Sequence, residues 1–193
     1  MSDLNKSRIT AAAKELLAGC GIADDDDLSA TPARVAGFYS EFFQHLHEPP
    51  PNLPLYPVTR ARSETIALHG IPFYSLCSHH LLPFFGTISV AYQPNTDWVL
   101  GFSGVVHIVN YYANRPTLQE TLATAVVNDI AQRFLKTNPE APPPFVYAEV
   151  NARQLCMEMR GVRTSGIDVI TSAQSGSPVT DWVVHAKSLF TRS

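Results

Sequence analysis

The sequence predicts an α+β protein in which a four-stranded antiparallel sheet carries two helices on one face. Four segments show the apolar alternation or clustering of strands: 64–69, 84–92, 145–151 and 167–172. Two segments between them, 103–114 and 117–136, repeat apolar residues at helical spacing. The order is therefore strand, strand, helix, helix, strand, strand. Because such a sheet has two edges with unpaired backbone groups, we expect it to oligomerise through them.

A helical appendage is expected before this sheet. Residues 9–20 repeat apolar side chains at helical spacing, and Thr31-Pro32 is typical of the start of a second helix. The prolines between 49 and 57 then predict an extended linker. We therefore divide the chain into an N-terminal appendage with its linker, 1–57, and a main domain, 58–193.

The composition is that of an ordinary soluble globular protein, with 45% apolar and 16% charged residues. A formal charge of -3 provides no general attraction to nucleic acid or to an anionic membrane, so neither is expected as a partner. No apolar run reaches the ~20 residues that span a bilayer. The N-terminus lacks a signal-peptide pattern. The 3 cysteines are too few and odd in number for a disulfide framework, which favours a reducing cytoplasm.

The strongest chemical signal is the segment Cys77-Ser78-His79-His80. Thiols and imidazoles are the donors that zinc prefers, but two ligands on one short segment do not hold a metal alone. Cys156 is the best candidate for a third ligand. Three protein ligands leave a fourth position for water, as in a catalytic zinc site. The alternative is that both cysteines are buried packing residues.

Six runs in register carry a resemblance to the GTP cyclohydrolase I family. They are residues 31–36, 77–86, 90–94, 101–103, 114–120 and 156–162. Enzymes of that family hydrolyse the imidazole ring of GTP and rebuild the product as dihydroneopterin triphosphate. The resemblance implies a tunnelling fold, in which strand-strand-helix-helix-strand-strand units close into a ring. It also implies a homo-oligomer, typically a decamer of two pentamers, with active sites between subunits.

The resemblance assigns roles to the cysteine–histidine segment. Cys77, His80 and Cys156 match the three zinc ligands of the family, so Zn²⁺ is the implied cofactor. His79 matches the histidine that shuttles protons to the imidazole ring, a role that suits a side chain titrating near neutral pH. The alternative is that His79 only orients the ligands.

Two residues at the start of the second main-domain helix match the pair that reads guanine, Gln119 and Glu120. A carboxylate can accept hydrogen bonds from N1–H and the 2-amino group together, a pattern that adenine does not offer. The alternative for Glu120 is a surface acid favoured by the helix dipole.

The phosphate-binding residues match the family only in part. Arg34 and Arg160 match phosphate-binding arginines, and Ser103 and His107 are further candidates for substrate binding. However, the family has lysine where this chain has Gly104, and arginine where it has His107. If each lost charge-assisted contact is worth ~1.5–3 kcal/mol, triphosphate binding is weaker by several kcal/mol.

Three further departures fall at functional positions. Gln154 stands where the family has a histidine, and glutamine cannot carry a proton between pH 5 and 8; we keep it beside His79 as a catalytic candidate. Ser78 and Thr121 replace a glutamate and an arginine. The metal ligands and the purine-reading pair survive, which indicates a divergent paralogue. It would act on a guanine nucleotide or nucleoside with fewer phosphates, or stop at the ring-opened formamidopyrimidine.

Three other interpretations stay open. The chain can be read as an ordinary GTP cyclohydrolase I, with its departures tolerated. It can also be read as a zinc-bearing purine-binding module or partner subunit without turnover, which Gln154 and Ser78 favour. A cysteine nucleophile, as in nitrile reductases of the same fold, is opposed by His80 and Cys156, because bound zinc would block the Cys77 thiolate.

Overall fold

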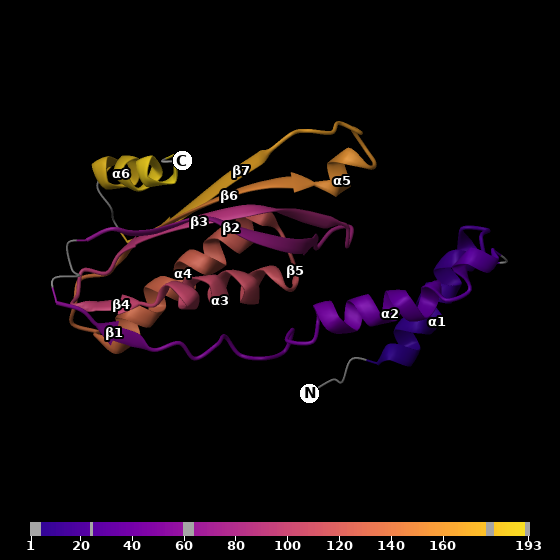
Figure 1. Ribbon diagram of the computed structural model, residues 1–193, viewed down its shortest axis with the longest axis horizontal. Helices are drawn as coiled ribbons and strands as arrows, with labels where there is room; N and C mark the ends of the chain where they lie inside the picture. Colours follow the sequence, from indigo (N-terminus) through magenta and orange to yellow (C-terminus); the bar gives the residue numbers. More distant parts are fainter. Residues whose placement is uncertain (1–4, 24, 60–63, 177–179, 192–193) are drawn as a thin grey trace. The chain divides into compact units, whose positions relative to one another are not determined.

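The computed structural model describes residues 5–23, 25–59, 64–176 and 180–191. They belong to two compact units, Met1–Pro49 and Pro50–Ser193. The first unit contains the helices α1 (Lys6–Gly19) and α2 (Thr31–Phe42), which contact each other, and a 3-10 turn, η1 (Asp26–Leu28), between them (Figure 1).

The second unit begins at Pro50, whereas the sequence analysis placed the boundary after residue 57. The difference comes from a two-stranded ribbon. Strand β1 (Leu55–Pro57) pairs antiparallel with β4 (Trp98–Leu100). The last part of the proline-rich segment is therefore bound to the main unit, although its composition is typical of a linker.

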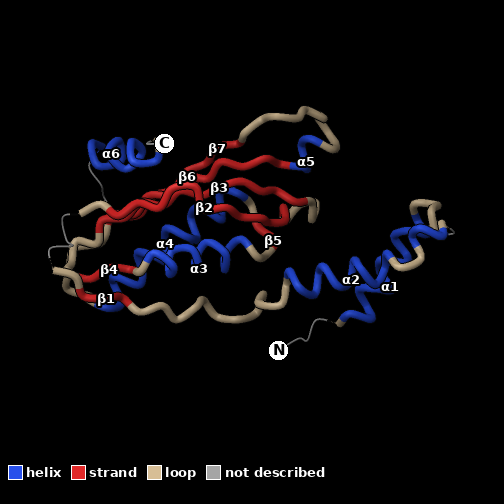
Figure 2. The backbone as a smooth tube through the Cα atoms, viewed as in Figure 1, coloured by secondary structure: helices blue, strands red, loops and turns tan. Residues whose placement is uncertain are grey.

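The second unit is built on a five-stranded sheet in the order β5-β2-β3-β6-β7 (Figure 2). Its strands are β2 (Ile66–Cys77), β3 (Pro83–Gln93), β5 (Pro116–Thr117), β6 (Phe145–Gln154) and β7 (Val169–Ser175). The long strands pair antiparallel, and β5 pairs parallel with the end of β2. The α+β class is confirmed, but the predicted number of four strands is wrong. A strand of 2 residues is too short to show alternation.

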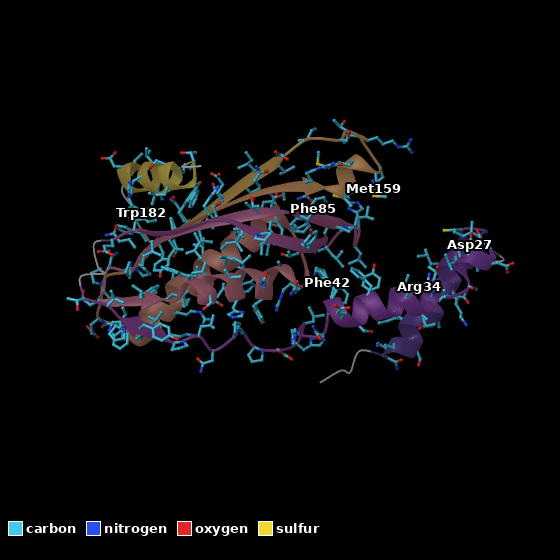
Figure 3. All side chains as sticks on the ribbon, viewed as in Figure 1. Asp27, Arg34, Phe42, Phe85, Met159 and Trp182 are labelled. Atoms are coloured by element: carbon cyan, nitrogen blue, oxygen red, sulfur yellow. The ribbon has the colours of Figure 1, made fainter. Side chains whose placement is uncertain are left out.

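Helices cover both faces of this sheet in Figure 1, with α3 (Phe102–Ala113) and α4 (Gln119–Thr137) on one face and α6 (Thr180–Phe190) on the other. The alternation of β3 explains this arrangement. Val90 packs in the cluster that α3 and α4 share with the sheet, whereas Ala91 packs in a separate cluster with α6. Trp182 of α6, labelled in Figure 3, stacks at a tilt on Phe145 with ring centroids 5.6 Å apart.

The main core lies between the sheet and the α3–α4 layer. The predicted apolar face of α4 is buried there, including Leu122, Val126, Ile130 and Phe134. Burying such side chains is the largest favourable contribution to folding. Among the described helices, none is both long and apolar enough to cross a membrane.

Replacing Tyr92 with phenylalanine should destabilise the main unit by about 1–2 kcal/mol in urea unfolding at pH 7. The Tyr92 hydroxyl is buried and donates a hydrogen bond of 2.6 Å to the carbonyl oxygen of Leu100, which the variant leaves unsatisfied. Burial also raises the pKa of Tyr92. The neutral form is thus favoured in the folded state, and stability falls as the pH rises above about 10, the ordinary tyrosine value. The variant should lose less stability over this alkaline range than the wild type; equal stability and equal alkaline slopes would contradict this account.

Candidate metal centre and active site

Three segments distant in sequence meet at one end of the sheet. The first is the turn between β2 and β3. The backbone N–H of Cys77 donates to Leu82 O at 2.9 Å, and the N–H of Leu81 donates to Cys77 O at 2.8 Å. Leu81 adopts a left-handed φ of 52° to close this turn. The short turn keeps both Cys77 and His80 at the end of the hairpin.

The second segment is α5 (Leu155–Glu158), which follows directly on β6. β6 lies beside β3, with Gln154 paired to Phe84, so Cys156 emerges next to the β2–β3 turn. The backbones approach closely at Gly86, where a Cβ atom would lie 2.0 Å from Asn151 O. Only glycine fits there without a backbone shift.

The third segment is the start of α4. Strand β5 pairs Thr117 with Cys77, and α4 begins two residues later at Gln119. Parallel pairing with the end of β2 therefore places the first turn of α4 beside the cysteine–histidine turn. The fifth strand, which the sequence analysis did not predict, thus positions part of the site.

Cys77, His80 and Cys156 form a group whose ligand atoms all lie within 4.8 Å of one another. The Sγ atom of Cys77 lies 3.8 Å from Nδ1 of His80. A tetrahedral zinc with bonds of ~2.0–2.3 Å separates its ligands by roughly 3.3–3.8 Å, so the three donors suit such an ion in type and the Cys77–His80 pair matches it in spacing. Burial and the neighbouring Cys77 thiol raise the pKa of Cys156. The group can hold a metal ion, and the positive charge of a bound ion would favour the thiolate forms of both cysteines.

A cavity of about 240 Å³ adjoins this group. Its walls come from the β2–β3 hairpin end, from β5 and the start of α4, and from the end of β6, α5 and the start of β7. The lining residues are Cys77, His79, Phe84, Thr117, Leu118, Gln119, Glu120, Gln154, Cys156, Met157 and Val169. Of the predicted site residues, the structure thus brings together both cysteine ligands, His79, the Gln119–Glu120 pair and Gln154. The apolar lining residues were missed, because such side chains look like ordinary core residues in a sequence.

The predicted phosphate-binding residues do not line this cavity. Ser103 and His107 are exposed on α3. Arg160 is exposed after α5, and its Nη1 contacts Nε2 of His80. Arg34 is exposed on α2 in the first unit (Figure 3). Of the predicted ligands and base-reading residues, the cavity within the second unit is therefore lined by Cys77, Cys156, Gln119 and Glu120, but by none of these four phosphate-binding candidates.

Two side-chain amides connect the walls of the cavity. Gln119 is buried, and its Nε2 donates to Val169 O at 2.7 Å and to Val150 O at 3.2 Å. Its Oε1 accepts a hydrogen bond of 2.6 Å from Nε2 of Gln154. Sequence reasoning missed these contacts, because backbone carbonyl groups are present at every residue and leave no signal in a sequence.

Gly104 has a packing role that the sequence did not indicate. It is buried in the first turn of α3, and a Cβ atom there would lie 2.9 Å from Cδ1 of Leu100. Leu100 is itself fully buried. A lysine at this position would require Leu100 to move.

Comparison with known proteins identifies the family of the chain. The family model described as GTP cyclohydrolase I matches residues 9–191. The chain is 38% identical over 185 residues to GTP cyclohydrolase 1 of Lactiplantibacillus plantarum, an alignment covering 94% of this chain and 93% of the relative. It is 38% identical over 179 residues to GTP cyclohydrolase 1 of Acetivibrio thermocellus, covering 92% of each chain. For that of Carboxydothermus hydrogenoformans the identity is 36% over 188 residues, covering 96% and 94%. Since the matches span nearly the whole chain, the metal-binding group included, the protein belongs to the GTP cyclohydrolase I family of hydrolases.

Proposed function

We propose that this protein hydrolyses the imidazole ring of a guanine nucleotide at C8, with Zn²⁺ held by Cys77, His80 and Cys156. The observation that carries the proposal is the convergence of these three ligands beside a cavity that His79 and Glu120 also line. Zinc bound there would supply a Lewis acid that makes a water molecule nucleophilic near neutral pH.

Glu120 reads the base. Its side chain lines the cavity from the first turn of α4 and remains exposed. A carboxylate in this place can accept hydrogen bonds from N1–H and the 2-amino group of guanine together.

His79 transfers protons to the purine ring. It lies on the cavity wall one residue before the metal ligand His80. An imidazole can both accept and donate a proton between pH 5 and 8, whereas the amide of Gln154, which also lines the cavity, cannot. With one imidazole in place of the two that the family uses, the reaction stops at, or passes slowly through, the formamidopyrimidine stage.

The substrate carries fewer phosphates than GTP. Gly104 supplies no cation and has no room for one while Leu100 keeps its position. His107 stands where the family has arginine, and it lacks the forked guanidinium that binds phosphate oxygens in pairs. Arg34, Arg160 and Ser103 remain as phosphate-binding candidates.

The active form is a homo-oligomer, with two pentameric rings as the expected assembly. β7 is the last strand of the sheet, and its Ile170 is 62% exposed. An edge strand with an exposed apolar residue favours pairing with another chain. Residues outside the cavity, such as Ser103 and His107, then serve the active site of a neighbouring subunit.

A zinc-bearing purine-binding module without turnover is the second candidate. The observation that favours it is the hydrogen bond from Gln154 to Gln119. Gln154 occupies the position of the family's second histidine, and this hydrogen bond engages its side chain within the protein. Prolonged incubation of the zinc-loaded protein separates the two candidates.

The test is to incubate zinc-loaded protein with GTP, GMP, guanosine and guanine and to follow each compound by mass spectrometry. We expect one of them to gain a water molecule, with or without loss of formate, and GMP or guanosine to react faster than GTP. Rapid conversion of GTP to a pterin would overturn the altered substrate and product. No mass change on any compound would favour the binding module.

A further inference from the structure

The side-chain amides of Gln119 and Gln154 form hydrogen bonds within the protein. Both line the cavity wall, and the sequence analysis assigned base reading to the first and catalysis to the second. A primary amide has two N–H donors and one oxygen that accepts. The donors and acceptors that are already engaged within the protein determine what each side chain can still offer to a ligand.

Gln119 has no donor left for a substrate. The side chain is 4% exposed, and its Nε2 donates to two backbone carbonyl oxygens, at 2.7 Å to Val169 and at 3.2 Å to Val150. Val150 belongs to β6 and Val169 begins β7. Since Gln119 is the first residue of α4, its amide joins three elements at the end of the sheet that carries the metal ligands.

These contacts determine the orientation of Gln154. Because Nε2 of Gln119 faces two carbonyl oxygens, its Oε1 must point the other way and needs a donor. Gln154 supplies that donor, with its Nε2 2.6 Å from Oε1 of Gln119. The oxygen of Gln154 is then directed toward Cys156, whose Sγ lies 3.9 Å away.

We propose that Gln119 and Gln154 are positioning residues: their linked amides hold the end of β6, and with it the α5 segment that carries Cys156, in place for the metal. The chain of hydrogen bonds runs from the carbonyl groups of β6 and β7 through Gln119 to Gln154, the residue directly before α5. The inference rests on the proposed function only in taking Cys156 as a zinc ligand. Of the Gln119–Glu120 pair, Glu120 alone then accepts hydrogen bonds from N1–H and the 2-amino group of guanine.

The experiment loads the full-length protein with Zn²⁺ and measures its release to a chromogenic chelator, together with the urea midpoint of unfolding. Gln119→Met and Gln154→Met remove the amides at similar side-chain length. We expect both to release zinc about 10- to 100-fold faster than the wild type, the usual effect of losing a group that orients metal ligands. Gln174→Met is the matched control, because Gln174 is exposed on β7, and it should release zinc at the wild-type rate.

A further variant separates the hydrogen bond from simple packing. Gln154→His keeps a ring N–H that can donate to Oε1 of Gln119, so it should release zinc more slowly than Gln154→Met. If both Gln154 variants release zinc at the wild-type rate, the proposal is wrong. It is also wrong if Gln119→Met changes only KM for the guanine nucleotide, as a base-reading residue would.

Misfolding of Gln119→Met and a wild-type protein without zinc are two further outcomes. Should Gln119→Met fail to fold, the Gln154 variants decide the matter, because that side chain is only half-buried. A wild-type protein that takes up no zinc would contradict the proposed function. The urea midpoints would then test the amide chain by themselves: it is supported if Gln154→Met lowers the midpoint and Gln174→Met does not, and overturned if the two are equal.

Discussion

The Cys156→Ser variant should contain no zinc after dialysis and should lose about a thousandfold or more of any ring-opening activity. The ligand atoms of Cys77, His80 and Cys156 lie within 4.8 Å of one another, and removing one sulfur leaves two donors on a single short turn. Two protein ligands do not retain zinc against dialysis, since structural and catalytic sites use three or four. A loss of several kcal/mol of transition-state stabilisation corresponds to a rate effect of this size.

Cys20→Ser provides the matched control, because Cys20 is an exposed free cysteine in the first unit. Zinc content by atomic emission and turnover by mass spectrometry should be unchanged in that variant. Full zinc occupancy in Cys156→Ser would show that Cys156 is not a ligand. Loss of activity with zinc retained would instead favour a direct chemical role for the thiol.

The Glu120→Gln variant should lose about a hundredfold to ten-thousandfold in kcat/KM for a guanine nucleotide. The carboxylate is proposed to accept two hydrogen bonds from the base, and each charge-assisted bond is worth about 1.5–3 kcal/mol. Glutamine has one oxygen to accept with, and its N–H groups would face the N–H groups of guanine. Zinc content should stay the same, since Glu120 is not a member of the metal-binding group.

Glu140→Gln is a suitable control for this comparison, because Glu140 is an exposed residue in the loop after α4. Steady-state kinetics on both variants tests the assignment. A Glu120→Gln variant with wild-type kcat/KM would mean that Glu120 is only a surface acid at the start of α4. The reading of the base would then have to come from elsewhere.

Much of the metal site could be predicted from the sequence, because Cys77 and His80 are close in the chain and their donor types suit one metal. The third ligand, Cys156, depends on β3 lying between β2 and β6, a pairing that only the sheet topology reveals. From the sequence, Cys156 was the best candidate by donor type, and the family resemblance then matched it to a zinc ligand. The grouping of these three residues in the structure agrees with that assignment.

Other features had no sequence signal. β5 is too short for a pattern, yet its pairing with β2 places Gln119 and Glu120 at the site. The hydrogen bonds of Gln119 go to backbone oxygens, which are the same at every residue. The role of Gly104 depends on the neighbouring Leu100, which packs against it in space. In each case the missing information was a tertiary contact.

In the proposed reaction, water attacks C8 of a guanine nucleotide at the zinc site. The most direct measurement is the mass of the products formed by zinc-loaded protein in water enriched in heavy oxygen. We predict that the labelled oxygen appears in the formyl group of a ring-opened product, or in released formate. An unchanged purine after prolonged incubation, with zinc fully bound, would contradict this account and favour a purine-binding protein.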